Sequence, residues 1–236
     1  MTGIGMCEKG SAREENQDSI LIRIHRDSGL FVVADGVAGA AYGALASKFL
    51  TESCFEWWNA FFLRHSDLPF AEIFEEIKFL AENVNQELVE TYGAGNSCST
   101  VALLFIHKAT YGYLSAGDSR IYLCDKRGAR QITRDDIWEN QPNAEHSTEH
   151  RGKILSAVGG YASLDYSCAT DRMERGTGFL LCSDGIYKYV DSRLIYDMLR
   201  GIYRKLVPEK RMIRRLTSAV GKAGADDNYS LIAVKA

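Results

Sequence analysis

The chain has 236 residues, 46% of them hydrophobic and 25% charged, with a net charge of −3. This composition predicts a single globular domain over residues 1–236, because no linker-like stretch divides the sequence. The small negative charge and the lack of a contiguous basic tract argue against nucleic acid as a partner. There is no leader pattern and no apolar run of about 18 residues, so we expect a cytoplasmic monomer without membrane insertion.

The six cysteines are scattered and include no Cys-x-x-Cys pair. Cys98, Cys124 and Cys182 lie in apolar runs, where a small buried thiol is expected rather than a zinc ligand or a disulfide. This pattern fits a reducing compartment.

The first 30 residues indicate two strands joined by a charged loop between Glu8 and Asp18. The loop contains Arg13-Glu-Glu-Asn-Gln-Asp18. Taken alone, it would be interpreted as a solvated turn.

The most informative stretch is residues 31–47, where the apolar run from Phe31 to Ala34 stops at Asp35-Gly36 and an alanine-rich helix follows. A carboxylate at the end of a buried strand is costly unless a positive charge lies against it. A structural salt bridge and a metal ion therefore both remain open for Asp35. Gly36 favours the metal, since it has no side chain to block its own carbonyl oxygen.

The rest of the chain alternates helical and strand patterns. After the alanine-rich segment that ends at Ser47, an apolar stripe from Phe49 to Phe62 keeps helical spacing. Apolar residues at helical spacing predict further helices over about 70–92, 192–206 and 209–223. Short β-type runs predict strands over 99–106, 110–116, 120–124, 178–183 and 228–234. Between about 135 and 154 we expect a flap. This order predicts an α+β fold, a layered α-β-β-α sandwich of two packed, mainly antiparallel sheets flanked by helices.

Three carboxylates share one placement: Asp35 and Asp184 each follow a buried strand, and Asp227 precedes the last one. Asp118 is a fourth member of the set. Carboxylate oxygens suit Mg²⁺ or Mn²⁺ rather than zinc. Several acids close together would repel each other unless cations lay between them, so the sequence favours at least two metal ions.

At this point the sequence resembles a known family, the metal-dependent Ser/Thr protein phosphatases called PPM or type 2C. The resemblance rests on short motifs that occur in the family's order over most of the chain: Arg13 to Asp18, Asp35-Gly36-Val-Ala-Gly39, Cys98-Ser-Thr100, Gly117-Asp118-Ser-Arg120, Ile132-Thr-Arg-Asp135, Leu155 to Gly159, Cys182-Ser-Asp184-Gly185 and Asp227-Asn228.

The resemblance implies an enzyme that uses two Mn²⁺ or Mg²⁺ ions, with a weaker third, to remove phosphate from the Ser/Thr substrates of a bacterial kinase. It implies that Asp35 bridges the ions while Gly36 offers its carbonyl, and that Arg13 binds the substrate phosphate. The remaining metal roles fall to Asp184 and Asp227 on the other side of the pair, Asp118 with Asp184 at the third ion, and Asp18 through a metal-bound water. Arg13, Asp35 and Asp184 would be the catalytic residues.

Two positions depart from the family pattern. Val37 stands where some members carry a histidine that protonates the leaving group, so water would do this or the group would leave unaided. Gln17 replaces the more usual glutamate. His146 and His150 in the flap have helical spacing, but lone imidazoles without orienting partners make a poor metal site. The alternative function is a pseudophosphatase that binds phosphoproteins without turnover.

Overall fold

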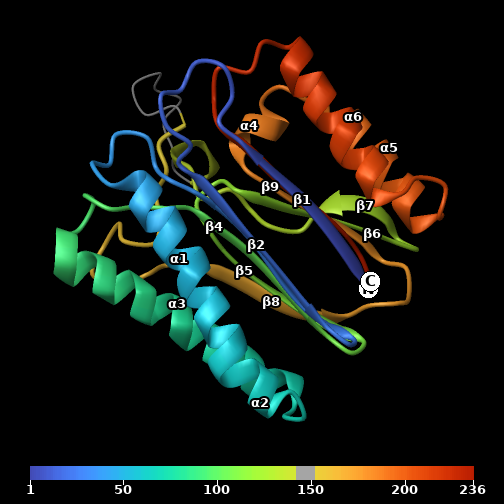
Figure 1. Ribbon diagram of the computed structural model, residues 1–236, viewed down its shortest axis with the longest axis horizontal. Helices are drawn as coiled ribbons and strands as arrows, with labels where there is room; N and C mark the ends of the chain where they lie inside the picture. Colours follow the sequence, from blue (N-terminus) through green and yellow to red (C-terminus); the bar gives the residue numbers. More distant parts are fainter. Residues whose placement is uncertain (142–151) are drawn as a thin grey trace.

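The computed structural model describes residues 1–141 and 152–236. Two antiparallel five-stranded sheets pack face to face, with helices covering their outer faces (Figure 1). One sheet has the order β1-β10-β9-β6-β7 and the other β2-β3-β4-β5-β8. The predicted α+β sandwich is confirmed. The strands are β1 (Thr2–Glu8), β2 (Asp18–His25), β3 (Ser28–Asp35), β4 (Val101–His107), β5 (Thr110–Ala116), β6 (Arg120–Asp125), β7 (Gly128–Gln131), β8 (Ser167–Arg172), β9 (Gly178–Cys182) and β10 (Tyr229–Lys235).

The β2–β8 sheet is covered by α1 (Gly43–Trp57) and α3 (Phe70–Tyr92). The predicted helix over 70–92 is confirmed. The preceding helix is interrupted by a π-helical turn, Trp58–Phe62, before the short α2 (Leu63–His65). Most of the predicted apolar stripe is buried, but Phe55 is exposed and its ring lies 4.1 Å from the Arg23 guanidinium carbon.

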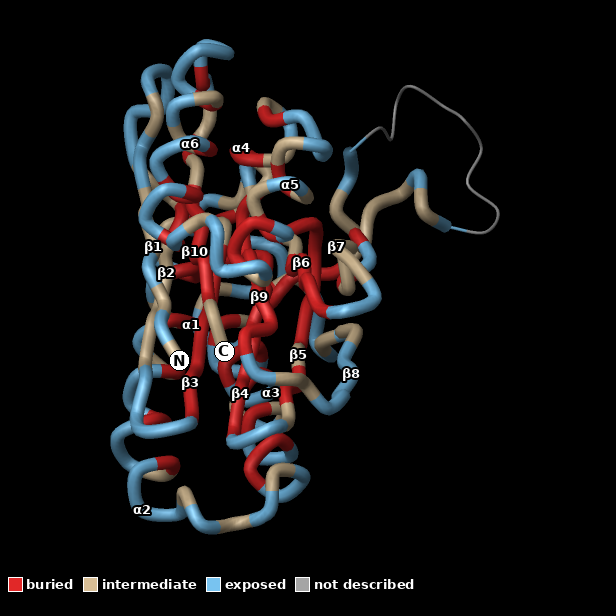
Figure 2. The backbone as a smooth tube through the Cα atoms, turned by 90° about the vertical axis from the view of Figure 1, so that its right-hand side faces the viewer, coloured by how far each residue is buried: buried red, intermediate tan, exposed pale blue. Residues whose placement is uncertain are grey.

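The other sheet is covered by α5 (Ser192–Tyr203) and α6 (Glu209–Lys222), with the short α4 (Asp184–Tyr187) at one end. Both long helices were predicted to within a few residues. Their apolar faces are buried against β9 and β10 through residues such as Leu199 and Leu216. Figure 2 shows the buried strands lying between helices whose outer faces are exposed.

A third layer of apolar side chains fills the space between the sheets, including Phe31, Leu104, Phe179 and Ile232. Strands β3, β4 and β9 are buried along nearly their whole length, which explains their continuous apolar runs in the sequence. The weakly apolar edge strands β7 and β8 were not predicted, because an edge strand needs no buried run. Among the described residues, no helix is long and apolar enough to cross a membrane.

The strand ends that carry the predicted carboxylates meet at one end of the sandwich. Asp18 opens β2 directly opposite Asp35, which closes β3. On the other sheet, the end of β9 lies beside the start of β10, since Leu231 pairs with Cys182. The fold therefore brings together four segments that are far apart in the sequence.

Substitution of Gly159 tests how closely this end of the fold is packed. Its φ is +82°, and a Cβ there would lie 1.9 Å from the carbonyl oxygen of Ser97. We expect Gly159→Ala to destabilise the protein more than Gly128→Ala, a matched control with φ +106° and open space around it. The control should lose about 1–2 kcal/mol from its left-handed backbone alone. Urea unfolding measures both, and equal losses would contradict the steric argument.

Candidate active site

A pocket of about 360 Å³ opens where the strand ends meet. Its lining includes six of the residues predicted from the sequence: Arg13, Asp35, Gly36, Asp118, Asp184 and Asp227. Asp18 is buried directly behind Asp35, its partner across the β2–β3 pair. The structure thus brings all the predicted site residues into one region.

The pair Asp18 and Asp35 sets the electrostatics of the pocket. One oxygen of Asp18, Oδ2, accepts a hydrogen bond of 2.8 Å from the Ser183 hydroxyl, whereas Oδ1 is buried and has no partner among the described residues. Burial raises the pKa of Asp18 to about 6. Burial, reinforced by the neighbouring acids Asp18, Asp184 and Asp118, raises the pKa of Asp35 well above its usual range. Proteins pair or neutralise such charges, so a cation is expected here.

The backbone at Gly36 is held closely by its neighbours. Its N–H donates to the carbonyl of Gln17 at 3.0 Å. A Cβ at Gly36 would lie 2.5 Å from the carbonyl carbon of Gly43, the first residue of α1. Only glycine allows the helix to begin this close to the pocket.

The loop that carries Arg13 is tied to the start of β10 by Asn228. The side-chain amide of Asn228 donates to the carbonyls of Lys9 and Glu15, at 2.7 and 3.0 Å, and its oxygen accepts from the N–H of Gln17 at 2.9 Å. Arg13 itself donates from Nε to Oδ1 of Asp227 at 2.9 Å. A salt bridge, the alternative to a metal ion that the sequence left open for Asp35, is therefore present at Asp227.

The opposite wall is formed by Asp118 and Asp184. The hydroxyl of Tyr187 donates to Oδ2 of Asp118 at 2.9 Å. Burial, followed by repulsion from Asp184, raises the pKa of Asp118 to about 6. Asp184 forms an ion pair with Lys188, one helical turn further on. Burial alone would lower the pKa of Lys188, but the Asp184 carboxylate raises it.

A further arginine supports this wall from behind. The guanidinium of Arg120 lies 3.4 Å from the centre of the Tyr187 ring and donates from two of its nitrogens to the carboxylate of Asp135. This stacking fixes Tyr187 and therefore the orientation of Asp118.

We tested whether these residues fit divalent ions. Within residues 1–141 and 152–236, no three His, Cys, Asp or Glu side chains are already grouped as metal ligands. Arg13, Lys188 and Tyr187 each hold one of the pocket carboxylates. The donor set nevertheless fits Mn²⁺ or Mg²⁺, since it consists of carboxylate oxygens and a glycine carbonyl, with a buried oxygen of Asp18 unpartnered behind it.

The profile described as protein phosphatase 2C matches residues 9–223. The chain belongs to the protein phosphatase 2C family.

Relatives agree with this assignment. A Mycoplasma genitalium protein provisionally named as a protein phosphatase is 26% identical over 211 residues, 83% of this chain and 81% of its own length. The serine/threonine protein phosphatase PstP of Mycobacterium tuberculosis is 25% identical over 241 residues, 95% of this chain and 43% of PstP. The crystal structure of the PstP catalytic domain with two manganese ions has a TM-score of 0.78 at 22% identity, covering 98% of this chain and 96% of that domain. The family and the enzyme class predicted from the sequence are confirmed.

The flap predicted over about 135–154 is described only at its two ends. The N–H of Trp138 donates to the carbonyl of Lys153 at 3.0 Å, so the two ends lie side by side. Gly152, Lys153 and Ile154 line the pocket. His146 and His150 lie outside the described residues.

Sequence analysis missed several residues that shape this phosphatase pocket. The spacing of Asp184 and Lys188, four residues apart at the start of a helix, is a signal that could have identified Lys188. Asn228 was noticed only as part of a motif. Its three hydrogen bonds to the Arg13 loop join segments more than 200 residues apart, which no local pattern reveals.

The raised pKa of Asp118 predicts a stability difference in the metal-free protein. The folded state favours the protonated acid, so ionisation above the unfolded value near 3.8 destabilises the fold, and the penalty is complete above about pH 6. At pH 7 in excess chelator, Asp118→Asn should therefore be more stable than the unmutated protein by about 2–3 kcal/mol. At pH 4 the difference should nearly vanish.

Urea unfolding of both proteins at several pH values measures this difference. Buried His107, whose pKa is lowered by burial, titrates in both proteins and cancels in the comparison. Asp171→Asn is a control, since that exposed carboxylate has a lowered pKa. A pH-independent difference would contradict a raised pKa at Asp118, whose first cause is burial and second the charge of Asp184.

Proposed function

We propose that the chain is a single phosphatase domain, residues 1–236 with a flap at about 135–154, that hydrolyses phosphoserine and phosphothreonine in proteins with Mn²⁺ or Mg²⁺. The observation that carries the proposal is one pocket lined by four aspartates, Gly36 and Arg13. Carboxylates supply metal ligands and arginine supplies a phosphate ligand, so the lining matches both needs of this reaction. The PstP domain, similar in fold, holds two manganese ions.

The proposed division of labour follows the positions of the residues. Asp35, Gly36, Asp184 and Asp227 would hold two ions, Asp118 with Asp184 a weaker third, and Asp18 would orient solvent behind Asp35. Such ions, when bound, neutralise phosphate charge and lower the pKa of a coordinated water toward physiological pH. Each of these acids gives one oxygen to its present cation, Oδ2 of Asp184 to Lys188 and Oδ1 of Asp227 to Arg13, so an ion would bind the other oxygen or displace that cation.

Arg13 would bind the substrate phosphate. Only its Nε hydrogen-bonds to another described residue, so both Nη groups are open to a phosphate at the mouth of the pocket. A planar guanidinium can offer two parallel N–H groups to phosphate oxygens. Its present partner, Asp227, would be released to the metals at the same time.

The alternative function is a pseudophosphatase that binds phosphoproteins as a regulatory module. Against it stands the retention of every predicted carboxylate, two of which carry raised pKa values near 6. Buried acids destabilise a fold, so a module that only binds has little reason to keep them.

The first functional prediction is metal-dependent turnover. Hydrolysis of an aryl phosphate and of a phosphothreonine peptide should require Mn²⁺ or Mg²⁺ and stop with chelator, because every proposed ligand is an oxygen. Calorimetry should show that Asp184→Asn weakens Mn²⁺ binding while the surface control Asp171→Asn does not. Full turnover in chelator, with metal content measured as nil, would rule out the metal mechanism. Phosphopeptide binding without turnover in either metal would favour the pseudophosphatase.

A second prediction distinguishes phosphate binding, the role proposed for Arg13, from metal binding. Arg13→Ala should bind Mn²⁺ at least as tightly, because Asp227 loses a competing cation, but it should lose about one to two decades in kcat/KM, mostly as a raised KM, since the lost contact is a charge-assisted pair of roughly 1.5–3 kcal/mol. Arg13→Lys should recover part of the loss. The exposed Arg64→Ala serves as the control. Weaker Mn²⁺ binding with an unchanged KM would instead leave Arg13 as a structural partner of Asp227.

A further inference from the structure

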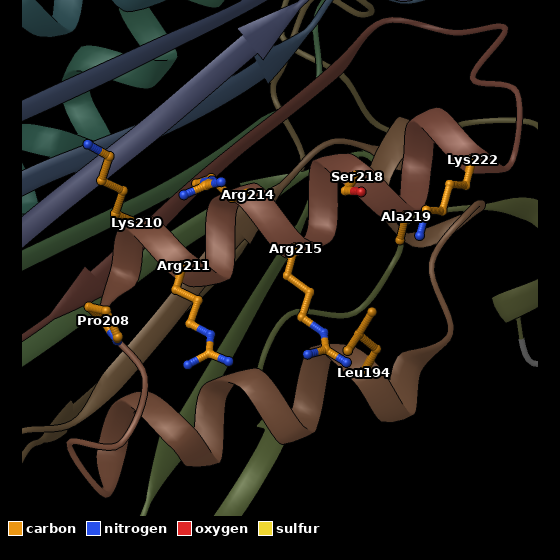
Figure 3. A pocket seen from close by; sticks show the side chains of 9 residues that line it. All are labelled: Leu194, Pro208, Lys210, Arg211, Arg214, Arg215, Ser218, Ala219 and Lys222. Carbon is orange, nitrogen blue, oxygen red and sulfur yellow. The ribbon is translucent and has the colours of Figure 1, made fainter.

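A second, larger pocket of about 790 Å³ lies between α5 and α6, on the outer face of the β1–β7 sheet. It is lined by five cationic side chains of α6: Lys210, Arg211, Arg214, Arg215 and Lys222. Figure 3 shows Arg211 and Arg215 extending from α6 toward α5, with Leu194 on the facing helix. The proposed reaction uses none of these residues.

These cations are not neutralised within the fold. In the part of the chain that the structure describes, none of the five forms an ion pair or a side-chain hydrogen bond. The only acid of α6, Glu209, is buried and accepts a hydrogen bond from Thr2. Five unpaired, exposed cations on one helix repel each other weakly in water, and an anion in the groove would relieve this repulsion.

The spacing of the cations matches an extended chain. Arg211 and Arg215 are four residues apart, or about 6 Å along the helix axis. Alternate side chains of an extended peptide point to the same side and repeat at about 6.6–6.8 Å. Acidic residues at every second position of such a segment would therefore meet the two arginines in turn.

We propose that the α5–α6 groove is a docking site for an acidic, extended segment of a partner protein, namely the phosphoprotein substrate. This inference rests on the proposed function only for the identity of the partner. Each Arg211 or Arg215 guanidinium would pair with one carboxylate, while the aliphatic surface of Leu194 and Ala219 contacts the peptide.

Other anionic partners fit the groove less well. The lining contains no aromatic side chain on which bases could stack, and the chain as a whole is negative. An anionic membrane would need exposed apolar residues along α6, whereas Met212, Ile213, Leu216 and Val220 are all buried.

The groove is within reach of the phosphatase pocket. α6 contacts α4, which begins at Asp184. Lys222 precedes Asp227 by five residues, so their Cα atoms are at most about 18 Å apart. Arg215 and Arg211 precede Lys222 by seven and eleven residues, or about 10 and 16 Å further along the helix. A substrate could therefore place its phosphorylated residue in the pocket and an acidic segment on these two arginines when roughly ten residues separate the two.

The test compares two phosphothreonine peptides, one with an acidic segment about ten residues from the phosphate and one with glutamines in its place. For the unmutated enzyme, the acidic peptide should have a kcat/KM about five- to thirtyfold higher. Arg211→Glu/Arg215→Glu should remove this preference while leaving hydrolysis of the glutamine peptide unchanged. The matched control, Arg64→Glu/Arg172→Glu, makes the same charge change at exposed arginines outside the groove and should keep the preference.

A binding assay separates this inference from the proposed function. Fluorescence anisotropy with a labelled acidic peptide that has no phosphate should show salt-sensitive binding that the groove variant loses, even if no substrate is hydrolysed. Circular dichroism establishes that the variant is folded. Equal binding by the variant, or equal kinetics for both peptides, would overturn the proposal. So would stronger groove-dependent binding of an oligonucleotide or of phosphatidylserine vesicles, which would assign the groove to those partners.

Discussion

The structure depends on one unfavourable interaction, the direct opposition of Asp18 and Asp35 across the β2–β3 pair. Like charges opposite one another destabilise a sheet, and burial makes each of them more costly. Residues of other elements donate hydrogen bonds to this pair. The hydroxyl of Ser183, for example, donates to Asp18. The fold tolerates this local cost because the large apolar layers on both sides of the sheets stabilise it elsewhere.

The same constraint explains why the protein's own cations sit in the pocket. Arg13 and Lys188 each neutralise one carboxylate, at Asp227 and Asp184. Both pairs are partly exposed, where an ion pair contributes at most about 1 kcal/mol. These pairs reduce the repulsion between the pocket carboxylates. Because they are weak, a stronger cation or a substrate can replace them without unfolding the protein.

The sequence predicted the layered fold, and the seven candidate site residues that it indicated lie together at one end of the sandwich, because buried strands and strand-end acids leave strong local patterns. It did not predict β7 and β8, whose edge positions need no apolar run, nor the π-helical turn after Trp57. It also missed Lys188, Tyr187 and the anchoring role of Asn228, since these depend on which distant segments meet. The sequence did not indicate the α6 cations as a group, because they do not form a contiguous basic tract. Their helical spacing gathers them on one surface.

The position of β10 has a consequence for biosynthesis. This strand lies between β1 and β9, and it is the last of the described strands to leave the ribosome. Until then β1 has no neighbour in its sheet, and the Arg13 loop lacks its anchor at Asn228. A nascent chain that stops short of Asn228 therefore carries the first seven motifs without the complete pocket lining, which forms only when the last of the described strands pairs between β1 and β9.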